Sequence, residues 1–314
     1  YLFRWFSFAR QSEDQSKDMS EDLPIEKATS ITASIMQKMP VTIAALLLFA
    51  IGYVMAKAMH ITDPALFLPL VAGFALWLID GVHGRFKTLP MLAAVTVGGY
   101  LLTKDLEGIN HLFSYLLIGG GVLVSISTMY RNDDRRGFYP LLTVLLLSLA
   151  TLLRAQTSLE FFFGWELMTL SSYLLVTLGK EAVKPALTYL LFSLASAYFV
   201  LAGFAVSYSA TGSLLLSNLG DSGESMALIF SLLAVGFLIK MGGFGMHIWL
   251  PATYAEADDD FSAILSAVVS KAGIFGLIII AAHLGIRSEI GLDPAYVLGW
   301  IGILTATFGA LMAL

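Results

Sequence analysis

The sequence contains 314 residues, of which 57% are hydrophobic and 13% are charged, with a formal net charge of −5. A soluble domain has about a quarter charged residues, so this composition, with a mean hydropathy of +0.80, is typical of an integral membrane protein. The absence of cysteine excludes iron–sulfur ligation, thiolate zinc sites and disulfides in this chain, and no basic face indicates nucleic-acid binding. The sequence begins with Tyr1 and ends within an apolar run, so we expect it to be part of a longer protein.

Residues 1–39 differ from the rest of the chain. Aromatic residues and Arg4 mark the first nine positions, as at a membrane interface, and residues 11–27 are polar and acidic. We therefore expect an interfacial segment followed by a solvated or partly disordered linker.

From Pro40 onward, apolar runs of membrane-spanning length recur. A span needs about 20 apolar residues, because about 30 Å of hydrocarbon is crossed at about 1.5 Å per residue. The pattern predicts an all-α, polytopic transmembrane helix bundle with about ten spans. The predicted helices are 41–59, 63–80, 88–103, 109–129, 139–154, 158–178, 184–210, 225–250, 260–285 and 295–314.

The loops between these helices predict their orientation. If the N-terminus is cytoplasmic, seven basic residues lie in inner loops and three lie on the outer side. The inner residues are Arg85, Lys87, Arg131, Arg135, Arg136, Lys180 and Lys184, and the outer residues are Lys104, Arg154 and Arg287. Because cytoplasmic loops carry an excess of Lys and Arg, this bias favours the ten-helix count and the orientation together.

Three ionisable residues lie close to the centres of predicted helices: Glu166, Lys240 and Lys271. A charge at that depth costs roughly 2.5–3.5 kcal/mol on insertion scales. Such residues usually face a bundle interior, pair with each other or line a wet path. Burial disfavours the charged forms of Lys and Glu and mutual attraction favours them, so protonation of Lys240 should depend on the position of Glu166. This arrangement indicates a proton switch.

The alternative is a buried ion pair that only fixes helix packing. One glutamate cannot neutralise two lysines, so Lys271 weighs against this alternative.

The predicted helix 225–250 contains a second unusual feature after Lys240. Three glycines follow within five residues, and Pro251 removes a backbone donor, so we expect a broken helix. Broken backbone at membrane depth survives where it packs against protein or lines a cavity. His247 lies seven residues from Lys240, two turns along on the same face, and could take up or relay a proton. The alternative places His247 at the membrane interface.

Other polar residues carry weaker signals. Asp258, Asp259 and Asp260 could gather protons on the inner side, although a solvated helix start explains them better. Four serines could hold water near the lysines or allow close helix packing, and we favour packing. These serines are Ser193, Ser196, Ser262 and Ser266.

Three stretches resemble the antiporter-like proton-translocating subunits of respiratory complex I, Mrp cation/proton antiporters and energy-converting membrane hydrogenases. The first contains Trp-Glu166-Leu within residues 161–173. The second runs from Lys240 through His247-Ile-Trp-Leu-Pro251, and the third is residues 262–273 around Lys271. The likeness covers residues 109–314.

This resemblance implies a modulating role for Glu166, a partner role for Lys240 and a relay role for Lys271. It also implies that the chain is the first inverted repeat of a longer fold, whose second repeat lies beyond this sequence. We accordingly divide the chain into an N-terminal interfacial and linker segment (1–39), N-terminal transmembrane helices (40–108) and an antiporter-like domain incomplete at its C-terminus (109–314).

The sequence thus predicts a proton-translocating subunit of a multisubunit membrane complex, in a prokaryotic-type inner membrane or an organellar membrane. Its expected partners are other membrane subunits, protons and the lipid bilayer, with no cofactor, metal or redox centre of its own. The alternatives are a subunit for Na⁺/H⁺ exchange or inorganic-carbon uptake, and a structural scaffold subunit.

Overall fold

The computed structural model describes residues 47, 49–54, 57–58, 63–80, 84–128, 135–179, 182–284 and 294–312. The predicted segment 1–39, much of the predicted helix 41–59, and the loop residues Arg131, Lys180 and Arg287 lie outside these residues. The described residues belong to one compact unit of the chain.

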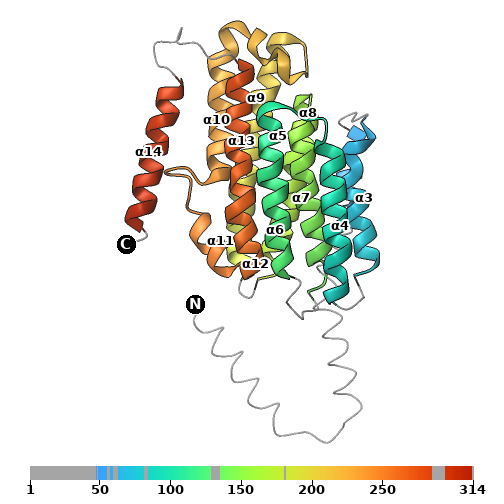
Figure 1. Cartoon of the computed structure of the whole chain (residues 1–314). Coiled ribbons are helices and arrows are strands. Elements are labelled where there is room, and N and C mark those ends of the chain that lie inside the picture. The colour runs from blue at the N-terminus through green and yellow to red at the C-terminus, as the bar shows by residue number, and fades with distance from the viewer. Residues whose placement is uncertain are drawn as a thin grey trace, which may run out of the picture. The chain divides into compact units, whose positions relative to one another are not determined.

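The described part of the chain is helical, with one isolated β-bridge between Thr157 and Leu215 (Figure 1). The elements are η1 (Pro64–Phe67), α3 (Leu68–Leu78), α4 (Gly84–Thr103), α5 (Gly108–Ser114), η2 (Tyr115–Gly119), α6 (Gly120–Ser127), α7 (Phe138–Arg154), α8 (Ser158–Val176), α9 (Val183–Thr211), η4 (Leu216–Asp221), η5 (Gly223–Ser225), α10 (Met226–Met241), α11 (Leu250–Glu256), α12 (Asp259–Ile264), η6 (Leu265–Val269), α13 (Ser270–Leu284) and α14 (Pro294–Met312).

Five helical stretches in this part of the chain are long and apolar enough to cross a membrane. They are Gly108–Ser127, Ser158–Val176, Val183–Thr211, Gly223–Met241 and Asp259–Leu284, and three shorter apolar helices accompany them. Two of the five contain a π-helical turn, η2 in the first and η6 in the last. The described chain therefore forms an all-α bundle of membrane-type helices.

Helix α7 lies at the centre of this unit. Sixteen of its 17 residues are buried, because α3, α4 and α8 pack around it. A helix that is apolar on all sides requires such burial. Lipid tails are as apolar as leucine, so close van der Waals contact stabilises these interfaces more than exclusion of water. Gly121 of α6 illustrates this contact, since a Cβ there would collide with Leu146 of α7.

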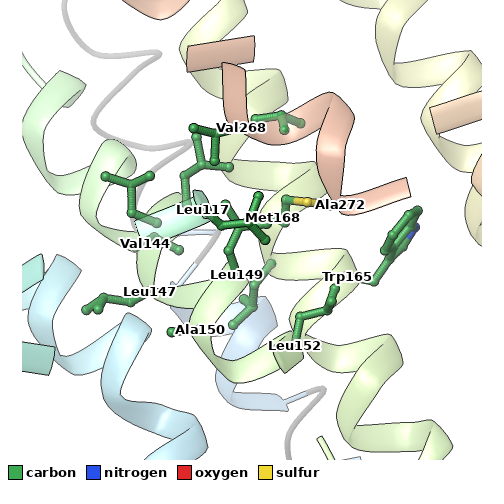
Figure 2. Packing of buried hydrophobic residues seen from close by; sticks show 14 of the residues in the cluster. Leu117, Val144, Leu147, Leu149, Ala150, Leu152, Trp165, Met168, Val268 and Ala272 are labelled. Carbon is green, nitrogen blue, oxygen red and sulfur yellow. The ribbon is translucent and has the colours of Figure 1, made fainter. Parts of the chain in front are cut away.

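The core continues from α7 toward α13. Figure 2 shows Met168 of α8 between the leucines of α7 and the side chains of Val268 and Ala272, which come from η6 and α13. Leu117 of η2 joins the same group, so the two π-helical turns lie close together at the core. On the other side, α9, α10 and α13 pack side by side (Figure 1). The interface of α8, α9 and α10 positions the polar site.

Candidate functional site

Lys240 is the largest charged side chain that is fully buried in the described part of the chain, with 1% of its surface exposed. Its Nζ donates hydrogen bonds to three hydroxyl groups: Thr169 Oγ1 at 3.1 Å, Tyr189 OH at 2.9 Å and Ser193 Oγ at 3.2 Å. Thr169 comes from α8, and the other two come from α9. The ammonium group thus has three partners for its three N–H donors.

These partners make the site suitable for either protonation state of the lysine. A hydroxyl oxygen accepts a hydrogen bond and its O–H can donate one, whereas a carboxylate only accepts. The same hydroxyls can therefore serve a charged ammonium or a neutral amine. The Tyr189 hydroxyl also lies 2.6 Å from Ser172 Oγ, and its ring centroid lies 4.8 Å from the Lys240 Nζ. The cation–π contact adds stabilisation to the charged form.

Glu166 lies one helical turn before Thr169 on α8 and is 8% exposed. Lys240 is the charged group that acts on it electrostatically, but no ion pair within 4.0 Å joins these two described residues. The buried Oε1 of Glu166 has no hydrogen-bond partner. Leaving a buried polar atom unpaired costs about 1–3 kcal/mol, and more for a charged group. The fold therefore keeps this oxygen buried within electrostatic reach of Lys240 and without a hydrogen-bond partner.

Two other pairs of charged residues are in direct contact. Lys87 Nζ lies 3.2 Å from Asp80 Oδ1, and Arg154 Nε lies 3.1 Å from Asp63 Oδ2. Burial raises the pKa of the Asp80 carboxyl, although the N–H of Gly137 and the nearby Lys87 act in the opposite direction. These pairs lie at helix ends, where a packing role suffices. Glu166 and Lys240 differ from these pairs, because neither has an opposite charge within 4.0 Å among the residues that the structure describes.

Lys271 is the second residue of α13, which follows the π-helical turn η6 directly. Its half-buried Nζ donates a hydrogen bond to Ser270 Oγ at 3.3 Å. The hydrogen bonds of Lys271 and Lys240 have no partner in common. The two lysines thus lie in separate polar surroundings.

His247 does not lie on the face of Lys240. Helix α10 ends at Met241, one residue after Lys240, so the prediction of a shared face two turns apart was wrong. The His247 ring packs instead on the ring of Phe308 in α14, with centroids 4.7 Å apart. Both residues line a mostly apolar cavity of about 230 Å³ between α14 and the segment that follows α10.

The glycines that follow Met241 explain why α10 ends there. Gly242 has φ +72°, and its N–H bonds to the carbonyl of Ile239 at 3.2 Å, while the N–H of Gly243 bonds to Leu238 at 2.9 Å. This pair of bonds is the Schellman arrangement, which needs a residue in the left-handed region. The indole N–H of Trp249 also donates to the Ile239 carbonyl at 3.0 Å. The helix therefore ends next to Lys240 with these backbone groups satisfied.

Two residues of the site, Thr169 and Tyr189, were not predicted from the sequence. Helical spacing could have indicated both. Thr169 is three residues after Glu166, and Tyr189 is four residues before Ser193, so each shares a helix face with a residue already singled out. Isolated hydroxyl residues are common in membrane helices, and this spacing alone did not distinguish them.

The predicted serines divide between two roles. Ser193 binds Lys240, whereas Ser196 donates to the Gly236 carbonyl at 2.7 Å and joins α9 to α10. Ser262 donates to the backbone carbonyl of Tyr254 at 3.0 Å. The packing interpretation therefore fails for Ser193 and holds for Ser196.

The acidic residues at the start of α12 have structural roles. Asp258 caps α12 through the N–H of Asp260, and both carboxylates pair with Arg135, at 2.6 Å and 3.0 Å. Glu256 and Asp259 line a neighbouring cavity of about 220 Å³. Among the residues that the structure describes, no three His, Cys, Asp or Glu side chains gather as a metal site requires.

The sequence and the fold both match known proteins. Residues 155–314 match the family described as NADH:quinone oxidoreductase/Mrp antiporter, TM. The chain is 29% identical over 259 residues to NAD(P)H-quinone oxidoreductase chain 4 1 of Synechococcus sp. (strain JA-3-3Ab), covering 80% of this chain and 48% of that protein.

Two solved structures have the same fold. One is the membrane-bound sulfane sulfur reductase, an archaeal respiratory membrane complex, with a TM-score of 0.66 and 24% identity over 79% of this chain and 46% of that chain. The other is respiratory complex I from Thermus thermophilus, with a TM-score of 0.65 and 23% identity over 79% of this chain and 58% of that chain.

The chain thus spans about half the length of the relatives that it matches. The family match confirms the resemblance predicted from the three motifs. The chain belongs to the transmembrane family of NADH:quinone oxidoreductase and Mrp antiporter subunits.

Proposed function

We propose that this chain moves protons across the membrane through Glu166, Lys240 and Lys271, as one subunit of a multisubunit membrane complex. The observation that carries the proposal is the environment of Lys240. A buried lysine that three hydroxyls surround, beside an unpaired buried carboxyl, is suited to gain and lose a proton. Family membership supports the same function.

The distance between Glu166 and Lys240 controls the proposed switch. At an effective dielectric constant of about 20, opposite unit charges attract by about 4 kcal/mol at 4 Å and about 2 kcal/mol at 8 Å. A difference of about 2 kcal/mol changes proton binding about 30-fold, since one pKa unit corresponds to about 1.4 kcal/mol. Movement of Glu166 toward the lysine loads a proton onto Lys240, and movement away releases it toward Lys271.

The proposed membrane topology has about ten spans, with α10 and α11 as two halves of one broken helix. The left-handed Gly242 and the start of α11 at Leu250, with Pro251 in its first turn, support this assignment. His247 lies between the two halves and is proposed to take up a proton from one side. The relay occupies the proposed domain 109–314 as the first inverted repeat of a longer protein.

Substitution of Lys240 tests the function. In vesicles that contain the assembled complex, Lys240→Ala and Glu166→Gln should lower coupled proton transport at least about tenfold, because each removes one charge of the switch. Dye quenching measures the transport, and copurification of the neighbouring subunits measures assembly. The matched control is Lys104→Ala at an exposed loop position, which should transport at the wild-type rate.

Two outcomes oppose the proposal. Normal pumping by Lys240→Ala would exclude the relay. Loss of assembly in Lys240→Ala and also in Lys240→Met, which keeps most of the side-chain volume, would indicate a scaffold subunit instead.

The identity of the coupled ion distinguishes the proposed proton relay from a second candidate function, Na⁺/H⁺ exchange. A subunit for Na⁺/H⁺ exchange would require Na⁺ for proton movement, whereas the proposed relay needs only hydroxyl, amine and carboxyl groups. Transport in Na⁺-free buffer distinguishes the two, and the identity of the copurifying subunits indicates what drives the complex.

A further inference from the structure

The segment between α10 and α11 (residues 242–249) extends toward α14 and contacts it (Figure 1). The backbone N–H of Phe244 donates a hydrogen bond to Thr305 Oγ1 at 2.9 Å, and the Thr305 hydroxyl donates to the backbone carbonyl of Ile301 at 2.7 Å. The hydroxyl proton is therefore bound within α14 itself, while the oxygen accepts from the segment. Thr305 thus joins two parts of the chain that lie 61 residues apart.

This hydrogen bond satisfies a backbone donor that lies outside the helices. Helix α10 ends at Met241 and α11 begins at Leu250, so the N–H of Phe244 belongs to neither. In the proposed broken span, such a group needs a partner within the protein, because lipid tails offer none. A side-chain hydroxyl from α14 supplies that partner.

Aromatic rings gather at the same contact. The ring of Phe308, three residues after Thr305 on α14, lies 4.7 Å from the His247 ring and 5.5 Å from the Phe244 ring, measured between centroids. The cavity of about 230 Å³ that these residues line leaves space for the His247 ring to move. Ring contacts alone therefore do not fix the imidazole. The directional hydrogen bond of Phe244, three residues before His247, limits where its backbone can lie.

We propose that Thr305 is a positioning residue, which holds residues 242–249 against α14 so that His247 can take up a proton. This inference rests on the proposed function and gives α14 a part in it. Thr305 acts through His247 and carries no proton itself, because its hydroxyl proton is bound to the carbonyl of Ile301.

Thr305→Val tests the position of the segment, since valine keeps the shape of threonine and removes the hydroxyl. In the assembled complex, amide hydrogen exchange of residues 242–249 should become at least about tenfold faster, because loss of one hydrogen bond favours local opening. Thr305→Ser keeps the hydroxyl and should show wild-type exchange. The matched control is Thr188→Val, which removes a hydroxyl that bonds to a carbonyl of its own helix, that of Lys184. This control should leave exchange of residues 242–249 unchanged.

Transport by the same variants in vesicles tests whether this position matters for function. Thr305→Val should lower coupled proton transport at least about fivefold, with copurification of subunits unchanged, and Thr305→Ser should transport at the wild-type rate. His247→Phe keeps a ring against Phe308 but cannot bind a proton, so it should lower transport by itself. Adding Thr305→Val to His247→Phe should cause no further loss, whereas a merely structural role for Thr305 would multiply the two losses.

Three results would overturn the inference and leave the relay through Lys240 standing. They are wild-type exchange of residues 242–249 in Thr305→Val, faster exchange with normal transport, and losses that multiply in the double variant. Undiminished transport by His247→Phe would overturn it as well, because Thr305 would then have no proton acceptor to position. Normal transport by Lys240→Ala would instead exclude the proposed function, and this inference with it.

Discussion

At the scale of single residues, the hydroxyls around Lys240 decide what the lysine can do. A carboxylate in direct contact would hold the amine in its charged form, since breaking a buried pair costs about 3–5 kcal/mol. Hydroxyls bind the ammonium less strongly and also suit the amine, so a smaller change in the surroundings is enough to move the proton. Glu166 can supply that change because it lies near Lys240 without bonding to it.

Thr169→Val tests this view of the site. Valine keeps the shape of threonine but removes one of the three acceptors of Lys240. A hydrogen bond to a charged group contributes about 1.5–3 kcal/mol, so the lysine should need roughly tenfold or more proton concentration to stay loaded. The pH profile of transport should therefore shift by about one unit or more toward acid.

The matched control for this prediction is Ser196→Ala. Ser196 also makes a buried hydrogen bond, but to the backbone of Gly236 rather than to Lys240. Its loss should lower thermal stability and leave the pH profile in place. An unshifted profile in Thr169→Val would show that Thr169 does not help to hold the proton.

The sequence allowed prediction of the charged members of the site, whereas Thr169 and Tyr189 were not predicted and packing was the favoured role for Ser193. Glu166, Lys240 and Lys271 stand out because charges are rare in apolar helices. Tyr189 does not stand out, because the direction in which its side chain points depends on how α9 crosses α10. The direction of His247 could not be predicted from helical spacing either, because α10 ends before it.

At the scale of elements, the close approach of α9 and α10 brings Tyr189 and Ser193 to Lys240. Gly236 of α10 permits this approach, because a Cβ there would lie 2.8 Å from the backbone oxygen of Ser196 and would also press on Val200. Real Cβ atoms do not come so near to backbone, so a larger residue would push the helices apart.

Gly236→Ala should therefore destabilise the protein by about 1–3 kcal/mol, the usual cost of overpacking a tight contact. The expected result is a lower melting temperature of the solubilised complex together with weaker transport. Gly120→Ala is the matched control, because the nearest atom to its new Cβ is a methyl of Val268 at an ordinary 3.9 Å. Equal melting temperatures for the two variants would contradict a glycine-dependent contact between α9 and α10.

Helix positions were predicted well where apolar runs are long, and poorly where they meet glycine or polar residues. The predicted 139–154 and 158–178 correspond to α7 and α8 within a few residues. The predicted 88–103 missed the first turn of α4, which begins at Gly84. The π-helical turns η2 and η6 left no pattern in the sequence, because one extra residue in a turn changes neither composition nor length noticeably.

At the scale of the whole molecule, the distribution of basic residues predicts which ends of the helices face the cytoplasm. Arg135 and Arg136 precede α7, and Lys184 lies in the first turn of α9. These residues lie in or next to connections that the positive-inside rule assigns to the cytoplasm. The loop between α9 and α10 contains no Lys or Arg, so the same rule predicts that it lies on the opposite side.

Single cysteines can test this topology cleanly, because the chain has no cysteine of its own. Ser217→Cys places a thiol at an exposed position in η4, between α9 and α10, and Ala255→Cys places one at an exposed position in α11. If α10 and α11 together cross the membrane once, a membrane-impermeant maleimide should label the two cysteines from opposite sides. Ala255→Cys should react from the cytoplasmic side and Ser217→Cys from the other. Labelling of both from the same side would mean that the chain turns back after Lys240 instead of continuing across, and the lysine would then lie at a re-entrant tip rather than within a broken span.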